Sequence, residues 1–183
     1  MVNIQLEWTP NPSTLKYVVD RKLLPYGALS LTSREEAELK SPLGLQLLGV
    51  KGITSVMLGP NFVTITKGDE GEWDEVNDSV MEAIQAFDVS GQPAIHEGAL
   101  VRPSPEGATE SEKKIRQLLE TEIRPAVAMD GGDITLSRYE NGVAYMHMQG
   151  SCAGCPSSQL TLKQGIESRL REIVPDLVEV VPV

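Results

Sequence analysis

The chain has 183 residues, which suffice for one large domain or for two domains of about 90 residues each. Its 16 lysines and arginines against 26 aspartates and glutamates give a formal net charge of -10, so its field repels nucleic acids and anionic membrane surfaces. A hydrophobic content of 40% with 23% charged residues is typical of globular proteins and argues against disorder throughout. We therefore expect a folded protein that binds neither nucleic acid nor membrane.

The first residues and the cysteine content indicate where the protein resides. The opening sequence, MVNIQLEWTPNPS, has neither the basic start and apolar run of an export signal nor the arginine-rich character of a transit peptide. Only two cysteines are present, which excludes the disulfide framework of a small secreted protein. These features predict a cytoplasmic protein.

A segment rich in proline and glycine divides the chain. Residues 98–109 read GALVRPSPEGAT and show no apolar periodicity, which is typical of a linker. We predict a first domain at residues 1–97, a flexible linker at 98–108 and a second domain at 109–183. Counting charges in the sequence gives -7 for residues 1–100 and -3 for residues 101–183, so the acidity belongs mainly to the first half.

The first half combines strand patterns with helical ones. Ile4, Leu6 and Trp8 alternate with polar residues as one face of a strand. Ser41-Pro42 predicts a helix start, since a hydroxyl caps the helix and proline suits its first position. Trp8 and Trp73 are expected in the core because both lie within apolar periodicities. The expected elements are strands at 4–8 and 15–19, a helix from 42, a hairpin of strands at 53–58 and 62–67, and a helix at 72–87.

The second half predicts the order α-β-β-α-β. Thr109 and Glu112 have the spacing of a capping box, and the helix that they begin ends near Asp130-Gly-Gly-Asp133, whose glycines indicate a helix stop and a turn. Strands are expected at 134–139, 143–149 and 177–181, with a second helix after Pro156. His147 falls within a strand and is not expected to be a metal ligand. Both halves are therefore of the α+β class.

Cys152 and Cys155 lie where a predicted strand ends and a predicted helix begins. Pro156 suits the first helical turn, and Gly154 can adopt backbone angles closed to other residues. The N–H groups and partial positive charge of a helix N-terminus favour anions, so we expect the pKa of both thiols to be lowered. Thiolates are ligands for soft metals.

Four interpretations of the cysteine pair are open. The thiols could simply fill apolar space, although flanking glycine, proline and serine are unusual there. A disulfide would close a loop of four residues, which stabilises by only about 2 kcal/mol, and the cytosol is reducing. A thioredoxin-like dithiol uses the same strand-to-helix placement, but its fold continues with a further hairpin and helix. The fourth interpretation is a metal site.

A metal site would need ligands from a second chain. Tetrahedral zinc and four-iron clusters each take four protein ligands, and one chain offers two thiolates. Two chains around a two-fold axis would offer four thiolates to one shared ion or cluster. The spacing does not separate zinc from an iron-sulfur cluster. A zinc-bridged interaction module and a thiol-disulfide oxidoreductase therefore remain as alternatives at this point.

Longer motifs resemble a known family. IRPAVAMDGGDITL at 123–136, GSCAGCPSSQLTLKQGIE at 150–167 and VPDLVEVV at 174–181 closely resemble the C-terminal module of NifU, which also occurs in Nfu proteins. TPNPSTLKY at 9–17 and GITSVMLGPNFVTITK at 52–67 resemble the N-terminal domain of Nfu proteins. Where this chain has Ala153, the family commonly has serine or another small residue.

The resemblance implies an iron-sulfur cluster carrier and not an enzyme. It implies that Cys152 and Cys155 from two subunits hold one [4Fe-4S] cluster per homodimer. It also implies that an upstream donor supplies the cluster and that apo iron-sulfur proteins accept it. Because the sequence does not contain the three-cysteine scaffold domain of full-length NifU, we expect carriage more than assembly. The first domain is expected to select partners.

Overall fold

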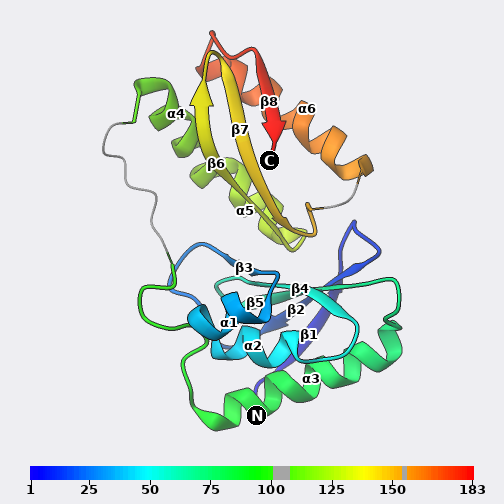
Figure 1. The fold of residues 1–183 in the computed structure, drawn as a ribbon. Coiled ribbons are helices and arrows are strands. Elements are labelled where there is room, and N and C mark those ends of the chain that lie inside the picture. Colours follow the sequence, from blue (N-terminus) through cyan, green and yellow to red (C-terminus); the bar gives the residue numbers. More distant parts are fainter. Residues whose placement is uncertain (101–107, 154–155) are drawn as a thin grey trace. The chain divides into compact units, whose positions relative to one another are not determined.

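The structure is a computed structural model that describes residues 1–100, 108–153 and 156–183, without the side chains of 156–159, 161 and 162 (Figure 1). The chain divides into two compact units, Met1–Val101 and Arg102–Val183. Within the linker predicted at 98–108, residues 101–107 lie outside the described residues. Each unit mixes helices with a sheet, which confirms the predicted α+β class.

The first unit is built on an antiparallel sheet with the strand order β1-β2-β5-β4-β3. Its helices α1, α2 and α3 all contribute side chains to one apolar cluster on the sheet. Over residues 1–100 the elements are β1 (Ile4–Trp8), β2 (Thr14–Val19), β3 (Leu29–Leu31), α1 (Arg34–Lys40), α2 (Pro42–Leu48), β4 (Ile53–Leu58), β5 (Phe62–Lys67) and α3 (Trp73–Ser90).

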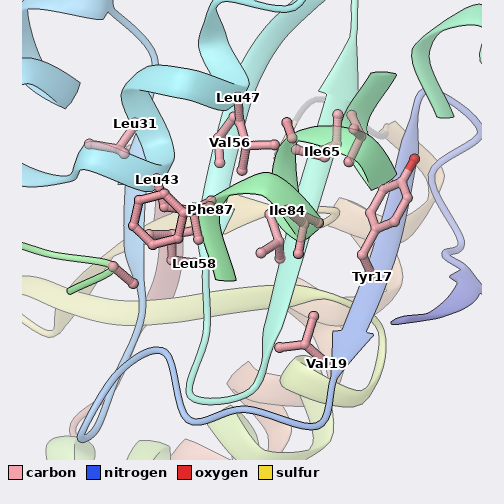
Figure 2. Packing of buried hydrophobic residues seen from close by; sticks show 14 of the residues in the cluster. Tyr17, Val19, Leu31, Leu43, Leu47, Val56, Leu58, Ile65, Ile84 and Phe87 are labelled. Atoms are coloured by element: carbon pink, nitrogen blue, oxygen red, sulfur yellow. The ribbon is translucent and has the colours of Figure 1, made fainter. Parts of the chain in front are cut away.

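The core of the first unit lies between this sheet and the helices. Figure 2 shows Leu43 and Leu47 of α2 and Ile84 and Phe87 of α3 among side chains from the strands. Ser41 is fully buried, and its hydroxyl accepts a hydrogen bond from the Gly44 N–H at 2.9 Å, so the predicted cap of α2 is confirmed. Burial of apolar surface is the main source of stability here.

The predicted elements of the first unit all form, but two further elements were missed. The missed elements are β3 and α1. The placement of Trp8 in the core is wrong, since 75% of this side chain is exposed. Trp8 lies on edge strand β1, opposite buried Leu15 of β2. The alternation of apolar and polar residues in β1 therefore placed Trp8 on the same face of the sheet as buried Leu15. The alternation does not reveal whether other side chains cover that face at Trp8. Trp73 packs against the core as expected.

The second unit has the predicted order α-β-β-α-β. Strands β6 and β7 pair antiparallel, and β8 pairs parallel with β7 after the crossover through α6. The described elements are α4 (Glu110–Leu118), the π-helical turn η1 (Leu119–Ile123), α5 (Arg124–Met129), β6 (Gly132–Glu140), β7 (Val143–Gly150), α6 (Pro156–Ile173) and β8 (Glu179–Pro182).

Local signals account for the boundaries in the second unit. The capping box at the start of α4 forms as predicted, with the Glu112 N–H donating to Thr109 Oγ1 at 3.2 Å. Asn141 and Gly142 both adopt positive φ in the turn between β6 and β7, as an Asn-Gly hairpin requires. In the described parts of both units, no helix is long and apolar enough to span a lipid bilayer.

Candidate metal centre

Cys152 lies in the turn between the end of β7 at Gly150 and the start of α6 at Pro156. This is the strand-to-helix junction that the sequence predicts. The Cys152 side chain is 7% exposed and belongs to the apolar core cluster of the second unit. Gly154 and Cys155 lie outside the described residues. The joint role of both cysteines therefore stays a prediction.

The Cys152 thiol lies against the backbone of Gly132, the first residue of β6. A Cβ atom built on Gly132 would be 2.4 Å from Cys152 Sγ, closer than real Cβ contacts come. The same Cβ would be 3.1 Å from Val127 Cγ1 and 3.2 Å from Ser151 Oγ. The sulfur atom therefore occupies the space that any other residue at position 132 would fill with its side chain.

Hydrogen bonds join the cysteine turn to the turn between α5 and β6. The Ser151 N–H donates to the Gly131 carbonyl at 3.2 Å, and the Ser151 hydroxyl donates to the Asp130 carbonyl at 2.5 Å. Gly131 has a φ of 75°, a conformation that favours glycine. These bonds fix the position of the residue directly before Cys152.

A largely buried ion pair holds the start of β6. The Arg124 guanidinium donates from Nε and Nη2 to the two carboxylate oxygens of Asp133 at 2.7 and 2.9 Å, and it also contacts Glu120. Burial alone would lower the pKa of Arg124, but the hydrogen bonds and charges of Asp133 and Glu120 outweigh burial, so this pKa is raised. The pair connects α5 to the residue next to Gly132.

The sequence-based interpretation of Asp130-Gly-Gly-Asp133 as a helix stop and turn is confirmed, but it is incomplete. Helix α5 ends at Met129, and the Asp130 N–H bonds back to the Val127 carbonyl at 3.1 Å. Sequence reasoning missed the contact of Gly132 with the thiol and the ion pair of Asp133. Two signals were available: a second glycine where one is enough for the turn, and an acidic residue directly before the apolar residues that begin the predicted strand.

The described residues of one chain do not by themselves complete a metal site. Among them, no group of three or more histidine, cysteine, aspartate or glutamate side chains is placed to hold a metal ion. His147, which was not expected to be a metal ligand, has its Nδ1 at 3.1 Å from the Val183 carbonyl oxygen. The available donor near the turn is the soft sulfur of Cys152, which suits zinc or an iron-sulfur cluster and not Mg²⁺ or Ca²⁺.

Two family models match the chain, one in each unit. The NifU-like domain matches residues 115–181, and the model described as scaffold protein Nfu/NifU N terminal matches residues 4–91. The protein named NFU1 iron-sulfur cluster scaffold homolog, mitochondrial, from Homo sapiens is 36% identical over 179 residues, covering 95% of this chain and 69% of that protein. The chain belongs to the Nfu/NifU-like family. The resemblance noted from both halves of the sequence is thereby confirmed.

Two further relatives extend this comparison. The Drosophila virilis protein of the same name is 40% identical over 179 residues, covering 95% of this chain and 59% of that protein. NifU-like protein 4, mitochondrial, from Arabidopsis thaliana is 37% identical over 180 residues, covering 95% of this chain and 63% of that protein. The chain thus spans about six tenths of the length of these two Nfu/NifU-like relatives.

The comparison overturns the expected cytoplasmic location. The human, fly and plant relatives are all named as mitochondrial proteins, which contradicts the expectation of a cytoplasmic protein. The expectation rested partly on the absence of a disulfide framework. The absence of a disulfide framework indicates a reducing compartment without saying which one it is.

Proposed function

We propose that this Nfu/NifU-like chain is an iron-sulfur cluster carrier, not an enzyme, which binds one [4Fe-4S] cluster between two copies through Cys152 and Cys155. An upstream donor supplies the cluster and apo iron-sulfur proteins receive it. The main observation that supports this proposal is the position of Cys152, at a strand-to-helix turn within the segment that matches the NifU-like domain. The human and fly relatives are named iron-sulfur cluster scaffolds.

Sharing the cluster between two chains makes it transferable. Each chain contributes two thiolates, which is half of the four ligands that the cluster takes. In transfer, an acceptor thiolate forms one iron–sulfur bond as one carrier thiolate leaves. The proton of the acceptor thiol passes to solvent or to the released carrier thiolate, and no electron moves. Repeated exchange moves the cluster without any redox step.

The charge distribution near Cys152 suits this cargo. Four thiolates around a [4Fe-4S] core of charge 2+ leave a formal charge of about -2, which carboxylates would repel. Residues 141–162, which contain both cysteines, include no charged side chain. The Asp133 carboxylate, on the strand beside the cysteine turn, is paired with Arg124. This pairing limits the repulsion between the Asp133 carboxylate and a loaded cluster.

The proposal assigns cluster binding to residues 109–183 and partner selection to residues 1–97, with 98–108 as a linker. The first region carries most of the negative charge. An acidic surface would steer and orient basic partner surfaces in the encounter. This part of the proposal predicts that exchange with an acceptor is slowed by salt.

Anaerobic reconstitution tests the proposal. We expect about four irons and four sulfides per dimer, measured by metal analysis and native mass spectrometry. Cys152→Ser and Cys155→Ser should each abolish loading and the loaded dimer. As a matched control, His147→Gln removes an imidazole from the same unit and should load normally. A loaded monomer, or retention of the cluster in the double cysteine variant, would contradict the proposal.

Two other outcomes would favour different functions. Stoichiometric zinc in protein from cells grown anaerobically with excess iron would favour a zinc-bridged interaction module. Insulin reduction by iron-free protein would favour a thiol-disulfide oxidoreductase. Direct transfer to a four-iron apo-enzyme that is faster than cluster loss to a chelator would support the carrier.

A further inference from the structure

We infer that Gly132 is a positioning residue for the Cys152 thiolate, an inference that rests on the proposed role of Cys152 as a cluster ligand. The inference concerns a glycine that the turn itself does not require. Gly131 has the positive φ that ends the helix and turns the chain. Gly132 already lies in β6, where it pairs with Gly150, and it is not among the described glycines with positive φ. Its backbone conformation is therefore open to residues other than glycine.

Space explains the glycine at position 132. The Cβ of an alanine would be 2.4 Å from Cys152 Sγ, and an ordinary contact begins at 3.4 Å. Subtracting the two distances shows that the sulfur atom would have to move by 1.0 Å. Such a shift is larger than the tolerance of about 0.5 Å within which a binding group must be held.

The other neighbours of this space leave little room for an alternative adjustment. Val127 and Ser151 are 4% and 3% exposed, and they are the next nearest groups to a Cβ at position 132. The Ser151 hydroxyl is held by its hydrogen bond to the Asp130 carbonyl. Cys152 has a single side-chain torsion that moves its sulfur atom, so rotation of the thiol is the easiest response. Alanine at position 132 would therefore drive the thiol out of its buried place.

Alkylation of the apo-protein tests whether Gly132 keeps the Cys152 thiol buried, and it needs no cluster. In the full chain with Cys155→Ser, Cys152 is the sole cysteine, so iodoacetamide reports on one thiol. Adding Gly132→Ala should raise the alkylation rate on the order of tenfold, because thiol reactivity depends on access. In the chain with both cysteines, Gly132→Ala should also speed loss of a reconstituted cluster to a chelator.

Two glycines of the same unit provide controls. A Cβ on Gly165 in α6 would have no described atom within 4 Å beyond the local backbone of its own helix, so Gly165→Ala should leave alkylation unchanged. Gly142 has a φ of 78°, and its Cβ would be 2.7 Å from the Asp176 carbonyl oxygen, so Gly142→Ala should destabilise the unit far along the hairpin from Cys152. If Gly142→Ala raises alkylation as much as Gly132→Ala does, the effect is general loosening and the inference is wrong.

A double-mutant cycle covers the case in which Gly132→Ala folds poorly. Cys152→Ala removes the sulfur atom, so Gly132→Ala should lower the urea midpoint, followed by circular dichroism, much less in that background. An equal loss in both backgrounds, or failure of both variants to fold, overturns the inference. An unchanged alkylation rate in Gly132→Ala also overturns it. If the native protein binds no cluster yet Gly132→Ala exposes the thiol, the positioning role stands and the carrier proposal fails.

Discussion

The two units use the same packing device with different occupants. In the first unit, the missing side chain of Gly44 leaves space for a leucine, since a Cβ there would be 2.1 Å from Leu31 Cδ1. In the second unit, the missing side chain of Gly132 leaves space for the Cys152 sulfur atom. The space left by a glycine thus accommodates a core leucine in one unit, and in the other it holds a reactive thiol in place.

Two buried polar side chains, Asp133 in the second unit and Tyr17 in the first, differ in their hydrogen bonding. In the second unit Asp133 is 5% exposed and has two hydrogen bonds from Arg124. In the first unit the Tyr17 side chain lies fully buried in the apolar core (Figure 2), and its hydroxyl has no hydrogen-bond partner among the described residues. Asp133 is thus held by its partner, whereas the Tyr17 hydroxyl is not, although other buried polar groups of the first unit, such as the Ser41 hydroxyl, are hydrogen-bonded.

The largest expected effect follows from breaking the ion pair in the second unit. Asp133→Ala leaves Arg124 mostly buried with only Glu120 as an acidic partner, and removing one partner of a buried pair costs about 3 kcal/mol of unfolding free energy. Urea unfolding followed by circular dichroism measures this loss. Both tryptophans, Trp8 and Trp73, are in the first unit, so the transition followed by tryptophan fluorescence should stay unchanged.

The exposed ion pair between Lys163 and Glu179 is the matched control for this prediction. Glu179→Ala should cost less than about 1 kcal/mol, because exposed pairs contribute little. If Asp133→Ala costs no more than Glu179→Ala does, the ion pair of Asp133 with Arg124 does not stabilise the second unit. The contrast between Asp133 and Tyr17 would then disappear.

A smaller effect is expected from filling the glycine gap of the first unit. Gly44→Ala would push against Leu31 and Ser41, which are both fully buried, and overpacking of this kind costs about 2 kcal/mol. Tryptophan fluorescence should report the loss, while alkylation of Cys152 should not change. A change in alkylation without a loss of stability would break the comparison between the two gaps. Gly165→Ala, in the second unit, is the control and should leave the tryptophan-fluorescence transition unchanged.

Much of the fold could be predicted because long apolar periodicities and turn residues mark most elements. The missed elements lack both signals. Strand β3 has three residues, and helix α1 has the sequence REEAELK with only Ala37 buried. Its formation depends on a serine cap and on packing rather than on an apolar stripe.

The candidate site was only partly predictable for a related reason. The place of Cys152 follows from local patterns, since a strand pattern precedes it and a proline follows. The role of Gly132 depends on a contact between residues 20 positions apart, and a glycine needed for space looks the same in sequence as one needed for a turn. Exposure of Trp8 likewise depends on which strand lies at the sheet edge.

The smallest expected effect has the opposite sign and concerns the Tyr17 hydroxyl, which has no hydrogen-bond partner among the described residues. Tyr17→Phe removes a buried polar atom and keeps the ring, so it should stabilise the unit by about 1 kcal/mol at neutral pH. Burial raises the pKa of Tyr17 above its ordinary value of 10.0. Above about pH 10, unfolding therefore releases a proton from Tyr17. The stability contributed by keeping the Tyr17 hydroxyl neutral in the folded state, fully present below pH 10, is lost as the pH rises further.

The stabilisation by Tyr17→Phe should accordingly grow between pH 8 and pH 10.5, because the variant lacks this proton release. Urea unfolding followed by tryptophan fluorescence at both pH values measures the difference between the two proteins and cancels the titration of groups that they share. Tyr145→Phe, in the second unit, should leave this transition unchanged. A variant that is less stable than the native protein at pH 8 would show that the Tyr17 hydroxyl has a partner, and the contrast with Asp133 would fail.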